Sequence, residues 1–485
     1  MRTADTYLRT GMYLEAIGAY SDIAEHASDD DMRARAVVRI GDIYSYFLNN
    51  YEGALAQYSM VVRHFSTSVH AANAYFNIGM ILYEKNRYRE ALAWFEEYLR
   101  RYPAGRRTAT ARFMIGACRT PPSPETKTGE PAEVRPDDTI RVLLTENATE
   151  VTLTASVPFE LRKPDDGTVV LTATGGQRVV AKLRRDSIEL NGHSFRVREL
   201  VVSVDHDGPV TVNAHSYRGR VRLYRKAGGL SVVNVVRIEE YLYSVVPKEM
   251  PPGWPLEALK AQAVAARTYA LYQKEKNKNR LFDVFASTAS QVYGGYTAEN
   301  DMTTRAVNET RGHVLLYDGR LILAYFHSDS GGMTEDAKNV WTADVPYLKS
   351  VRDSFSVAGP HDRWVYRSGF EEIGRSLKSK GLDIGTIYGI RPVATSPSGR
   401  VQTVTIVHSK GETILSGNHF RVNIDPATIK STLFMFGKGT RGVSLEGRGY
   451  GHGVGMSQWG AYNMAKAGHS HVAILKHYYR GVKVR

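Results

Sequence analysis

One cysteine, Cys118, is present among the 485 residues of the chain. A lone thiol cannot form a disulfide within the chain, and it cannot supply the ligands of a cysteine-cluster metal site. Cysteine-poor chains occur in the cytoplasm and in the cell envelope alike, so this scarcity leaves the compartment open. The fold must be held by packed cores instead, and the length predicts two or three domains.

The sequence also lacks any apolar run as long as the eighteen or so residues that a membrane-spanning helix requires. With 42% hydrophobic and 23% charged residues, its composition is that of an ordinary soluble globular protein. No charged and then apolar signal segment precedes the first expected helix. A soluble chain without a transmembrane span is therefore expected.

Three common catalytic motifs are missing. Without Gly-Lys-Ser or Gly-Lys-Thr, nucleotide binding is disfavoured. Ser328 and Ser330 do not stand in Gly-x-Ser-x-Gly, which disfavours serine hydrolysis. Because His-Glu-x-x-His is also missing, the histidines near the C-terminus are expected to be solvated and not metal ligands. These are His452, His469, His471 and His477.

Negative charge is in short supply, since 50 Asp and Glu oppose 63 Lys and Arg and leave a net charge of +13. This balance favours an acidic partner, which could be nucleic acid, an anionic membrane surface or a carboxylate-bearing cell-wall polymer. The basic residues are scattered along the chain, so no motif supports nucleic-acid binding. A generally basic, solubilising surface is the alternative explanation.

An internal repeat occupies residues 1–118. Glycines recur at Gly41, Gly79 and Gly116, and tyrosines at Tyr13, Tyr51 and Tyr88. The period of about 37 residues is close to the tetratricopeptide length of about 34. In the third copy, Gly79, Ala91, Phe95 and Pro103 match the small, alanine, aromatic and terminating-proline positions of a repeat that resembles this family. The sequence predicts an all-α, tetratricopeptide-like solenoid that serves as a protein-interaction module.

The first copy of the repeat is incomplete. Aligning it on Tyr13 and Ala16 puts Ala4 opposite Gly79, so the chain would begin in the middle of a helix. A half helix exposes apolar surface and lacks a cap. We therefore expect a start further upstream, with an export signal missing from this sequence.

Composition changes after the repeats. Residues 119–138 are rich in Pro, Glu, Thr, Lys and Asp without apolar periodicity, which predicts a flexible linker. Residues 139–236 contain short apolar runs bounded by Gly, Asp and Asn, which predict a β-rich part. Residues 237–485 mix strands and helices, so 139–485 is expected to form one α+β domain whose second part is catalytic.

Glu249 stands between prolines, in Val246-Pro247-Lys248-Glu249-Met250-Pro251-Pro252-Gly253-Trp254-Pro255. Because proline fixes its own φ and restricts the residue before it, Glu249 is expected to project from a stiffened loop. A fixed carboxylate suits general acid/base chemistry. A helix should begin at Pro255 and run to about Lys276. Its predicted apolar face consists of Leu256, Leu259, Ala263, Ala266 and Ala270.

Two glycine-rich segments are further candidates for ligand contact. Ser330-Gly331-Gly332 follows an expected strand, Leu321–Tyr325, and small residues there let backbone N–H groups approach a ligand. An ordinary Ser/Gly turn is the alternative. Gly447–Tyr462 alternates glycines around Ser457, a predicted N-cap whose helix stops at Gly468. Such a loop could hold an anion at the helix N-terminus.

Several of these segments, in this order, resemble the stage II sporulation protein D family, also called the SpoIID/LytB domain. The matching segments are Val233–Val235 through Glu240–Leu242, Val246–Met250, Trp254–Ala270, Ser330–Gly332 and Gly451–Gln458. The resemblance spans residues 139–485. It implies an α+β domain with a β-rich N-terminal part, located on the envelope side of the cell.

The resemblance also implies an activity: lytic transglycosylation of peptidoglycan strands without stem peptides, which leaves 1,6-anhydro-muramoyl ends. The family's catalytic glutamate falls on Glu249. One carboxylate can protonate the glycosidic oxygen and then deprotonate the attacking 6-hydroxyl, so no second one is needed. Glu239, Glu240 and Glu257 are therefore expected to be structural or solvent-facing.

An acid that works near neutral pH needs a raised pKa, which Met250, Trp254 and the prolines could provide by burying the carboxyl group of Glu249. Lys248 would oppose this if it pointed inward. The candidate substrate-binding residues are Gln262, Arg267, Ser330, Gly331, Gly332, His452, Ser457 and Gln458. For Gln262 and Arg267, locking the helix against the sheet is an equally good alternative.

One feature departs from the family. Some members bind zinc through cysteines and histidines near the Ser-Gly-Gly segment, whereas this chain has His327-Ser328-Asp329-Ser330 there and no cysteine. Neither zinc nor another cofactor is therefore expected.

Two other functions stay open. The LytB branch of the family is described as enhancing a cell-wall amidase, so the chain could bind glycan without cutting it, and its helical repeats could recruit an amidase or another envelope protein. Nucleic-acid binding has the least support.

Overall fold

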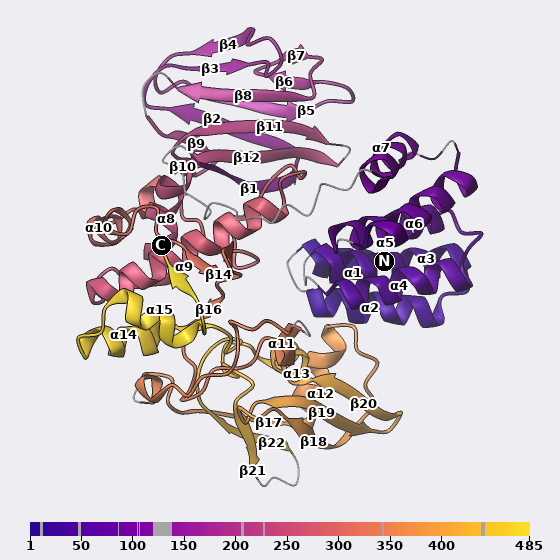
Figure 1. Ribbon diagram of the computed structural model, residues 1–485, viewed down its shortest axis with the longest axis vertical. Coiled ribbons are helices and arrows are strands. Elements are labelled where there is room, and N and C mark those ends of the chain that lie inside the picture. Colours follow the sequence, from indigo (N-terminus) through magenta and orange to yellow (C-terminus); the bar gives the residue numbers. More distant parts are fainter. Residues whose placement is uncertain are drawn as a thin grey trace. The chain divides into compact units, whose positions relative to one another are not determined.

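The computed structural model describes residues 1–9, 13–46, 50–85, 87–103, 105, 107–119, 138–204, 208–226, 228–341, 344–357, 359–437 and 442–485 (Figure 1). The chain forms two compact units. Unit 1 comprises Met1–Glu130, Ala337–Val345 and Trp364–Gly447, and unit 2 comprises Pro131–Asp336, Pro346–Arg363 and Arg448–Arg485. Most of the expected linker, residues 120–137, lies outside the described residues.

Unit 1 begins with helices that pack in chain order, each against the next (Figure 1). Their bounds are α1 Arg2–Arg9, α2 Tyr13–His26, α3 Asp30–Tyr46, α4 Tyr51–His64, α5 Ala71–Glu84, α6 Tyr88–Arg101 and α7 Thr108–Arg119. The repeat tyrosines each begin a helix, and the repeat glycines each lie within one. The predicted all-α repeat region is confirmed.

The repeat is built on a contact between a glycine and an aromatic ring. Tyr58 and Phe95, at matching positions of α4 and α6, are 0% exposed. A Cβ atom on Gly41 would lie 2.6 Å from Tyr58 Cε1, and one on Gly79 would lie 2.8 Å from Phe95 Cε1. Glycine thus lets the two helices of each repeat approach closely.

Gly79→Ala is therefore expected to destabilise the helical repeats by about 1–3 kcal/mol, since the new methyl group would displace the Phe95 ring. The measurement is urea unfolding followed by circular dichroism. Gly116→Ala is the matched control, because a Cβ atom at Gly116 meets nothing within 4 Å and alanine favours helix by up to about 1 kcal/mol. Equal effects of the two substitutions would contradict this packing.

The rest of unit 1 contains two three-stranded sheets with short helices. One sheet has the order β17-β22-β21 and the other β18-β19-β20. The elements are α11 Lys338–Trp341, β17 Trp364–Gly369, α12 Phe370–Ser379, β18 Ile387–Thr395, β19 Val401–His408, β20 Gly411–Ser416, α13 Gly417–Ile424, β21 Phe434–Gly437 and β22 Gly442–Gly447. Val404, Phe420 and Leu445 join one core among them.

Unit 2 starts with two β-sheets, which confirms the β-rich part. Their strands are β1 Thr139–Ala148, β2 Glu150–Ala155, β3 Phe159–Arg162, β4 Val169–Ala173, β5 Val179–Leu183, β6 Ile188–Leu190, β7 His193–Phe195, β8 Glu199–Val204, β9 Val210–Val212, β10 His215–Tyr217, β11 Arg220–Lys226, β12 Gly229–Arg237 and β13 Val284–Phe285. The sheet orders are β13-β1-β12-β11-β8-β3-β4 and β10-β9-β2-β5-β6-β7. Val142 and Leu153, from different sheets, share one core, so the sheets pack face to face.

Helices cover the start of this sandwich. They and the remaining small elements are α8 Ile238–Glu249, α9 Leu256–Lys276, η1 Tyr296–Ala298, α10 Asp301–Glu309, β14 Leu315–Tyr317, β15 Arg320–Leu321, β16 Phe326–His327, η2 Ser354–Ser356, β23 Met456–Ser457, α14 Gln458–Lys466, α15 His471–Tyr478 and β24 Lys483–Val484. Helices α8 and α9 contact β1, and Figure 1 shows both beside it. Strand β12 leads directly into α8, so the sheet fixes where that helix begins.

Two local expectations are corrected. The expected strand Leu321–Tyr325 is not formed: β15 ends at Leu321, and β16 begins only at Phe326. The predicted helix from Pro255 to Lys276 is present as α9, with Pro255 as its N-cap. It is not apolar on one face only, because every residue from Ala258 to Leu271 is buried except Lys260. Helices buried all round are typical of a protein core.

Within the described part of the chain, we find no helix with the length and apolar character needed to cross a bilayer.

Candidate active site

Glu249 is the last residue of α8, and Pro247 lies within the last turn of that helix. The expectation of a stiffened loop is therefore wrong. Pro251 instead ends the helix. It follows Met250, which is extended, with φ −131° and ψ 138°, so the helix cannot continue past Glu249. The carboxylate is thus fixed by a helix end.

The Glu249 side chain is partly buried and bonded on one oxygen. The backbone N–H of Val292 donates to Glu249 Oε1 over 2.9 Å. Burial raises the pKa of the Glu249 carboxyl group, and the Val292 hydrogen bond opposes this only in part. Lys248 is exposed, so its ammonium group does not counteract the burial. This environment favours a neutral carboxylic acid.

A stability change follows from the raised pKa. A group whose pKa is raised by folding stabilises the protein fully below its unfolded pKa, about 4.3 for Glu, and this contribution is lost as the pH rises through the folded pKa. Glu249→Gln removes the buried charge but keeps the acceptor for Val292. Its melting temperature should exceed that of the wild type at pH 7.5 and by less at pH 4, as differential scanning fluorimetry can test. A gain that is equal at both pH values would contradict a raised pKa.

Glu257 and Glu239, unlike Glu249, both have cationic partners among the described residues. Burial alone would raise the pKa of Glu257, but hydrogen bonds from Lys260 and His471 outweigh it and lower that pKa to about 2. Glu239 is 3% exposed and forms an ion pair with Arg267. Both carboxylates therefore have structural partners, as expected.

Arg267 lies inside the protein, at 0% exposure. Its guanidinium group donates to both carboxylate oxygens of Glu239, at 2.9 and 2.6 Å, and to the carbonyl oxygens of His313 and Val307. No part of the group faces solvent. Its candidacy as a substrate-binding residue is thus corrected. Arg267 does lock its helix in place, as the alternative expected, but it joins α9 to α8 and α10 and not to the sheet.

Gln458 connects the C-terminal motif to Glu249. Its Nε2 donates to the backbone oxygen of Glu249 at 3.0 Å and to Gln262 Oε1 at 3.4 Å. A carbonyl at a helix end lacks an intrahelical partner, so Gln458 caps α8 at Glu249. Gln262 is fully buried, and its Nε2 has no hydrogen-bond partner among the described residues. The structure thus brings Gln262 and Gln458 together beside Glu249.

The Ser-Gly-Gly segment and the C-terminal motif lie side by side, through parallel pairing of β16 with β23. The backbone N–H of Ser330 donates to Ser457 Oγ at 3.2 Å, and Ser330 Oγ donates to Asp353 at 2.8 Å. Asp329 accepts hydrogen bonds from Ser356 Oγ and the Gly331 N–H. Both Ser330 and Ser457 are 0% exposed, so these two candidates are corrected from ligand contacts to the bonds that join the segments.

The backbone conformations of the two segments also require glycine. Gly331 and Gly332 have φ of 69° and 103°, values that residues other than glycine rarely adopt. Ser457 is the N-cap of α14, because its Oγ accepts from the Gly460 N–H, and Gly468 follows the helix end with φ 88°. Both predictions for this helix are confirmed.

His452 is partly buried beside other rings. Its Nδ1 accepts from the Val454 N–H at 3.1 Å, and its ring centroid lies 5.5 Å from that of His327 and 5.9 Å from that of Tyr325. His471 instead pairs with Glu257. Among the described residues, no three His, Cys, Asp or Glu side chains are grouped so that they could hold a metal ion.

Three aromatic side chains cluster next to Glu249 and Gln458 in the sequence. The Trp254 ring lies 4.7 Å from that of Trp459 and 4.9 Å from that of Tyr462, and the latter two are 5.2 Å apart. All three are partly exposed. Such a cluster offers an apolar surface with polar edges, which suits a sugar ring.

Reasoning from the sequence missed two features of the site. One is the Val292 backbone N–H, which no side-chain pattern reveals. The other is the pair of buried aspartates, Asp329 and Asp353, whose hydrogen bonds hold the glycine-rich segments. The Asp329-Ser330 neighbourhood was a signal for the first of these aspartates, but Asp353 lies in a segment without a motif.

Comparison with known proteins adds families for three stretches of the chain. Residues 226–317 match the family described as stage II sporulation protein, residues 45–106 match the tetratricopeptide repeat, and residues 358–455 match a domain of unknown function. The first two agree with the resemblances seen in the sequence.

Individual relatives extend the match. An uncharacterised protein of Brachyspira hyodysenteriae is 34% identical over 347 residues, which are 71% of this chain and 92% of the relative. The amidase enhancer of Bacillus subtilis is 32% identical over 67% of this chain, but only 51% of that protein is covered. The stage II sporulation protein D of Bacillus amyloliquefaciens is 34% identical over 54% of this chain and 78% of the relative. The chain therefore belongs to the stage II sporulation protein D family.

Proposed function

We propose that the protein is a peptidoglycan lytic transglycosylase that cuts glycan strands without stem peptides and leaves 1,6-anhydro-muramoyl ends. The observation that carries the proposal is the carboxyl group of Glu249, which is fixed at a helix end and has a pKa raised by burial. A carboxyl group with these properties can be a proton donor near neutral pH.

The contact with Val292 assigns roles to the two oxygens of Glu249. Oε1 accepts the Val292 N–H, so the proton of the neutral acid belongs on Oε2. Oε2–H donates this proton to the glycosidic oxygen while the bond to C1 breaks and positive charge develops on the sugar ring. The resulting carboxylate takes the proton of the 6-hydroxyl as that oxygen forms a bond to C1. The group thereby returns to its starting protonation state.

A single carboxylate suffices for this sequence because the nucleophile belongs to the substrate. Hydrolysis by inversion would need a second carboxylate to activate water. Glu239 and Glu257 are held in ion pairs with Arg267, Lys260 and His471, so neither is free for such a role.

Substrate contacts are proposed for groups around Glu249. The Gln458 side chain, which donates to Gln262 Oε1, can hydrogen-bond sugar hydroxyls, whereas Gln262 is fully buried and positions Gln458. His452 is a candidate for the lactyl carboxylate, and the aromatic cluster of Trp254, Trp459 and Tyr462 for ring stacking. The backbone N–H groups of Gly331 and Gly332 already donate to Asp329 Oδ1 and Ser330 Oγ, so they serve the loop and not the substrate. Such a substrate would require a location in the cell envelope.

The second candidate function is enhancement of a cell-wall amidase without cleavage of glycan. It is favoured by the similarity to a relative named amidase enhancer, of which this chain spans about half. The helical repeats would then recruit the amidase.

Mass spectrometry of stem-peptide-free glycan strands after incubation with the protein separates the two functions. Transglycosylation gives fragments whose new ends are lighter by one water than hydrolysis products. Intact strands, together with faster release of peptides when a cell-wall amidase is added, would contradict the transglycosylase and support the enhancer.

A further inference from the structure

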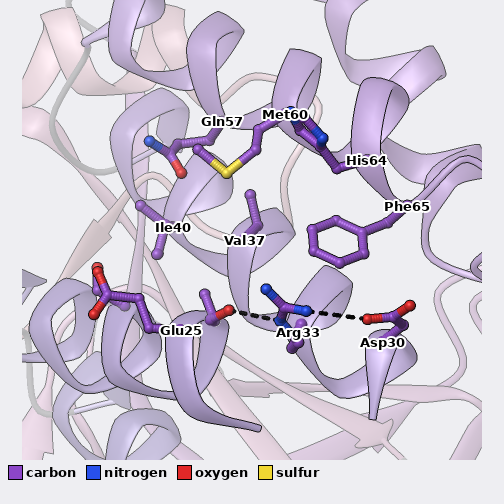
Figure 2. A pocket seen from close by; sticks show the side chains of 11 residues that line it. Glu25, Asp30, Arg33, Val37, Ile40, Gln57, Met60, His64 and Phe65 are labelled. Atoms are coloured by element: carbon purple, nitrogen blue, oxygen red, sulfur yellow. Dashed lines mark hydrogen bonds and ion pairs between the residues drawn. The ribbon is translucent and has the colours of Figure 1, made fainter. Parts of the chain in front are cut away.

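A cavity of about 650 Å³ opens among the first helices of the chain (Figure 2). It is lined by α2, α3 and α4, so it lies wholly within unit 1 and involves the second helices of two successive repeats and the helix between them. The described side chains of the proposed active site belong to unit 2. This cavity is therefore a separate feature of the molecule.

The floor of the cavity is apolar. Val37, Ile40 and Phe65 are largely buried, and Met60, which also lines the cavity, is 40% exposed. Figure 2 shows Val37 at the centre, with Phe65 and Ile40 on either side. An apolar side chain that entered would remove this surface from water, which is worth about 25 cal/mol for each Å².

Some polar side chains at the rim are hydrogen-bonded and others are not. Arg33 is engaged: it donates to the Ala24 carbonyl oxygen at 2.9 Å and to Asp30 at 3.2 Å, and its guanidinium lies 5.3 Å from the Phe65 ring centroid. The side chains of Glu25 and Gln57 have no hydrogen bond or ion pair with any described residue. The positive charge of Arg33 is balanced by Asp30, so the negative charge of Glu25 has no ion-pair partner among the described residues.

The next repeat shows what fills such a groove. Val37 and Tyr75 each stand four residues before the repeat glycine of their helix, and Gln57 and Trp94 each stand six residues after the repeat tyrosine. Small or polar residues in the second repeat thus correspond to large aromatic residues in the third. The two grooves share their helical framework but differ in content.

In the third repeat these aromatic residues pack on one another. The Tyr75 ring lies 5.6 Å from that of Trp94 and 6.0 Å from that of Tyr102, and the guanidinium of Arg101 lies 5.2 Å from the Tyr75 ring centroid. The same framework therefore accommodates aromatic rings with a cation beside them.

We propose that the cavity of the second repeat is a docking site for a partner protein that inserts one aromatic side chain with a basic residue next to it. The ring would take the space that Tyr75 and Trp94 fill one repeat later. The basic residue would pair with Glu25, whose charge has no partner, and Gln57 could hydrogen-bond a Tyr hydroxyl or Trp N–H. Interface hot spots are enriched in Trp, Tyr and Arg that fill well-packed pockets.

The test uses the full-length protein and fluorescein-labelled peptides in fluorescence polarisation. The probe carries Lys-Trp-Lys in a glycine–serine frame, and the comparison peptides carry Lys-Ala-Lys and Glu-Trp-Glu in the same frame. The probe should bind at least about tenfold more tightly than either comparison peptide, since both the ring and the positive charge contribute.

Two variants locate the binding. Gln57→Trp copies the third repeat and fills the cavity, so it should abolish binding of the probe. Glu25→Gln removes the rim charge without filling the cavity and should weaken binding about tenfold at low salt, whereas Glu52→Gln, an exposed and charge-matched control on α4, should have no effect. Melting temperatures no lower than that of the wild type would show that the variants fold.

Several results would overturn the proposal. One is the absence of probe binding up to about 1 mM, the weakest affinity that a specific site would be expected to show. Another is equal binding by wild type and Glu25→Gln. A dimer of the protein that Gln57→Trp dissociates, as measured by light scattering, would show that a second copy occupies the cavity.

Discussion

Replacing Glu249 by Gln should lower the cleavage rate of stem-peptide-free glycan strands by about 1,000-fold or more. General acid/base catalysis by one group contributes about 10²–10⁴-fold, and here the same group serves both proton transfers. Gln keeps the size of the side chain and its acceptor for the Val292 N–H, but it has no acidic proton. The measurement is the initial rate of anhydro-end formation, followed by mass spectrometry.

Glu146→Gln is the matched control, because Glu146 is an exposed glutamate of the same unit. It should cleave like the wild type. Circular dichroism of both variants should equal that of the wild type, since neither substitution removes a buried contact. Cleavage by Glu249→Gln at more than about a tenth of the wild-type rate would be incompatible with an acid/base role for Glu249.

The second large effect concerns stability. Arg267→Met should lower the free energy of unfolding of unit 2 by about 3–5 kcal/mol, because it leaves the buried Glu239 carboxylate without its cation. Chemical denaturation monitored by tryptophan fluorescence measures this change. Trp254 and Trp459 report on unit 2, and the unfolding of unit 1, which contains Trp94, Trp341 and Trp364, should stay as in the wild type. The loss is predicted even though Arg267 touches no proposed substrate group.

Two controls separate charge from packing. Arg196→Met breaks the ion pair between Arg196 and Asp186, whose side chains are 86% and 60% exposed, respectively. It should therefore lower the free energy of unfolding by less than about 1 kcal/mol. The double variant Arg267→Met, Glu239→Leu removes both buried charges and should recover part of the stability. A loss below about 1 kcal/mol for Arg267→Met alone would contradict the lock between α8, α9 and α10.

The helical repeats and the β-rich part could be predicted because their signals are local. Gly79 and Phe95 follow a fixed spacing whose cause, a ring against a glycine, lies within one repeat. Short apolar runs between turns likewise indicate strands without knowledge of their partners. The grouping of residues 364–447 with the helices in unit 1 depends on contacts between distant residues, and the sequence has no pattern for it.

The site could be predicted in part. The proline pattern predicts a fixed carboxylate at Glu249 but wrongly places it in a loop, because proline usually ends a helix, whereas Pro247 lies inside α8. A sequence motif carries no information on burial, so it cannot distinguish a substrate contact from a fully buried residue such as Arg267 or Ser330. Val292 contributes a backbone group, which any residue but proline could supply.

The most direct test of the account is cleavage of stem-peptide-free glycan in water enriched in heavy oxygen, with analysis of the new ends by mass spectrometry. Attack by the 6-hydroxyl predicts anhydro ends without the solvent isotope, and it predicts that Glu249→Gln forms them at least about 1,000-fold more slowly. Ends that carry solvent oxygen would show that water is the nucleophile and would contradict transglycosylation by a single glutamate.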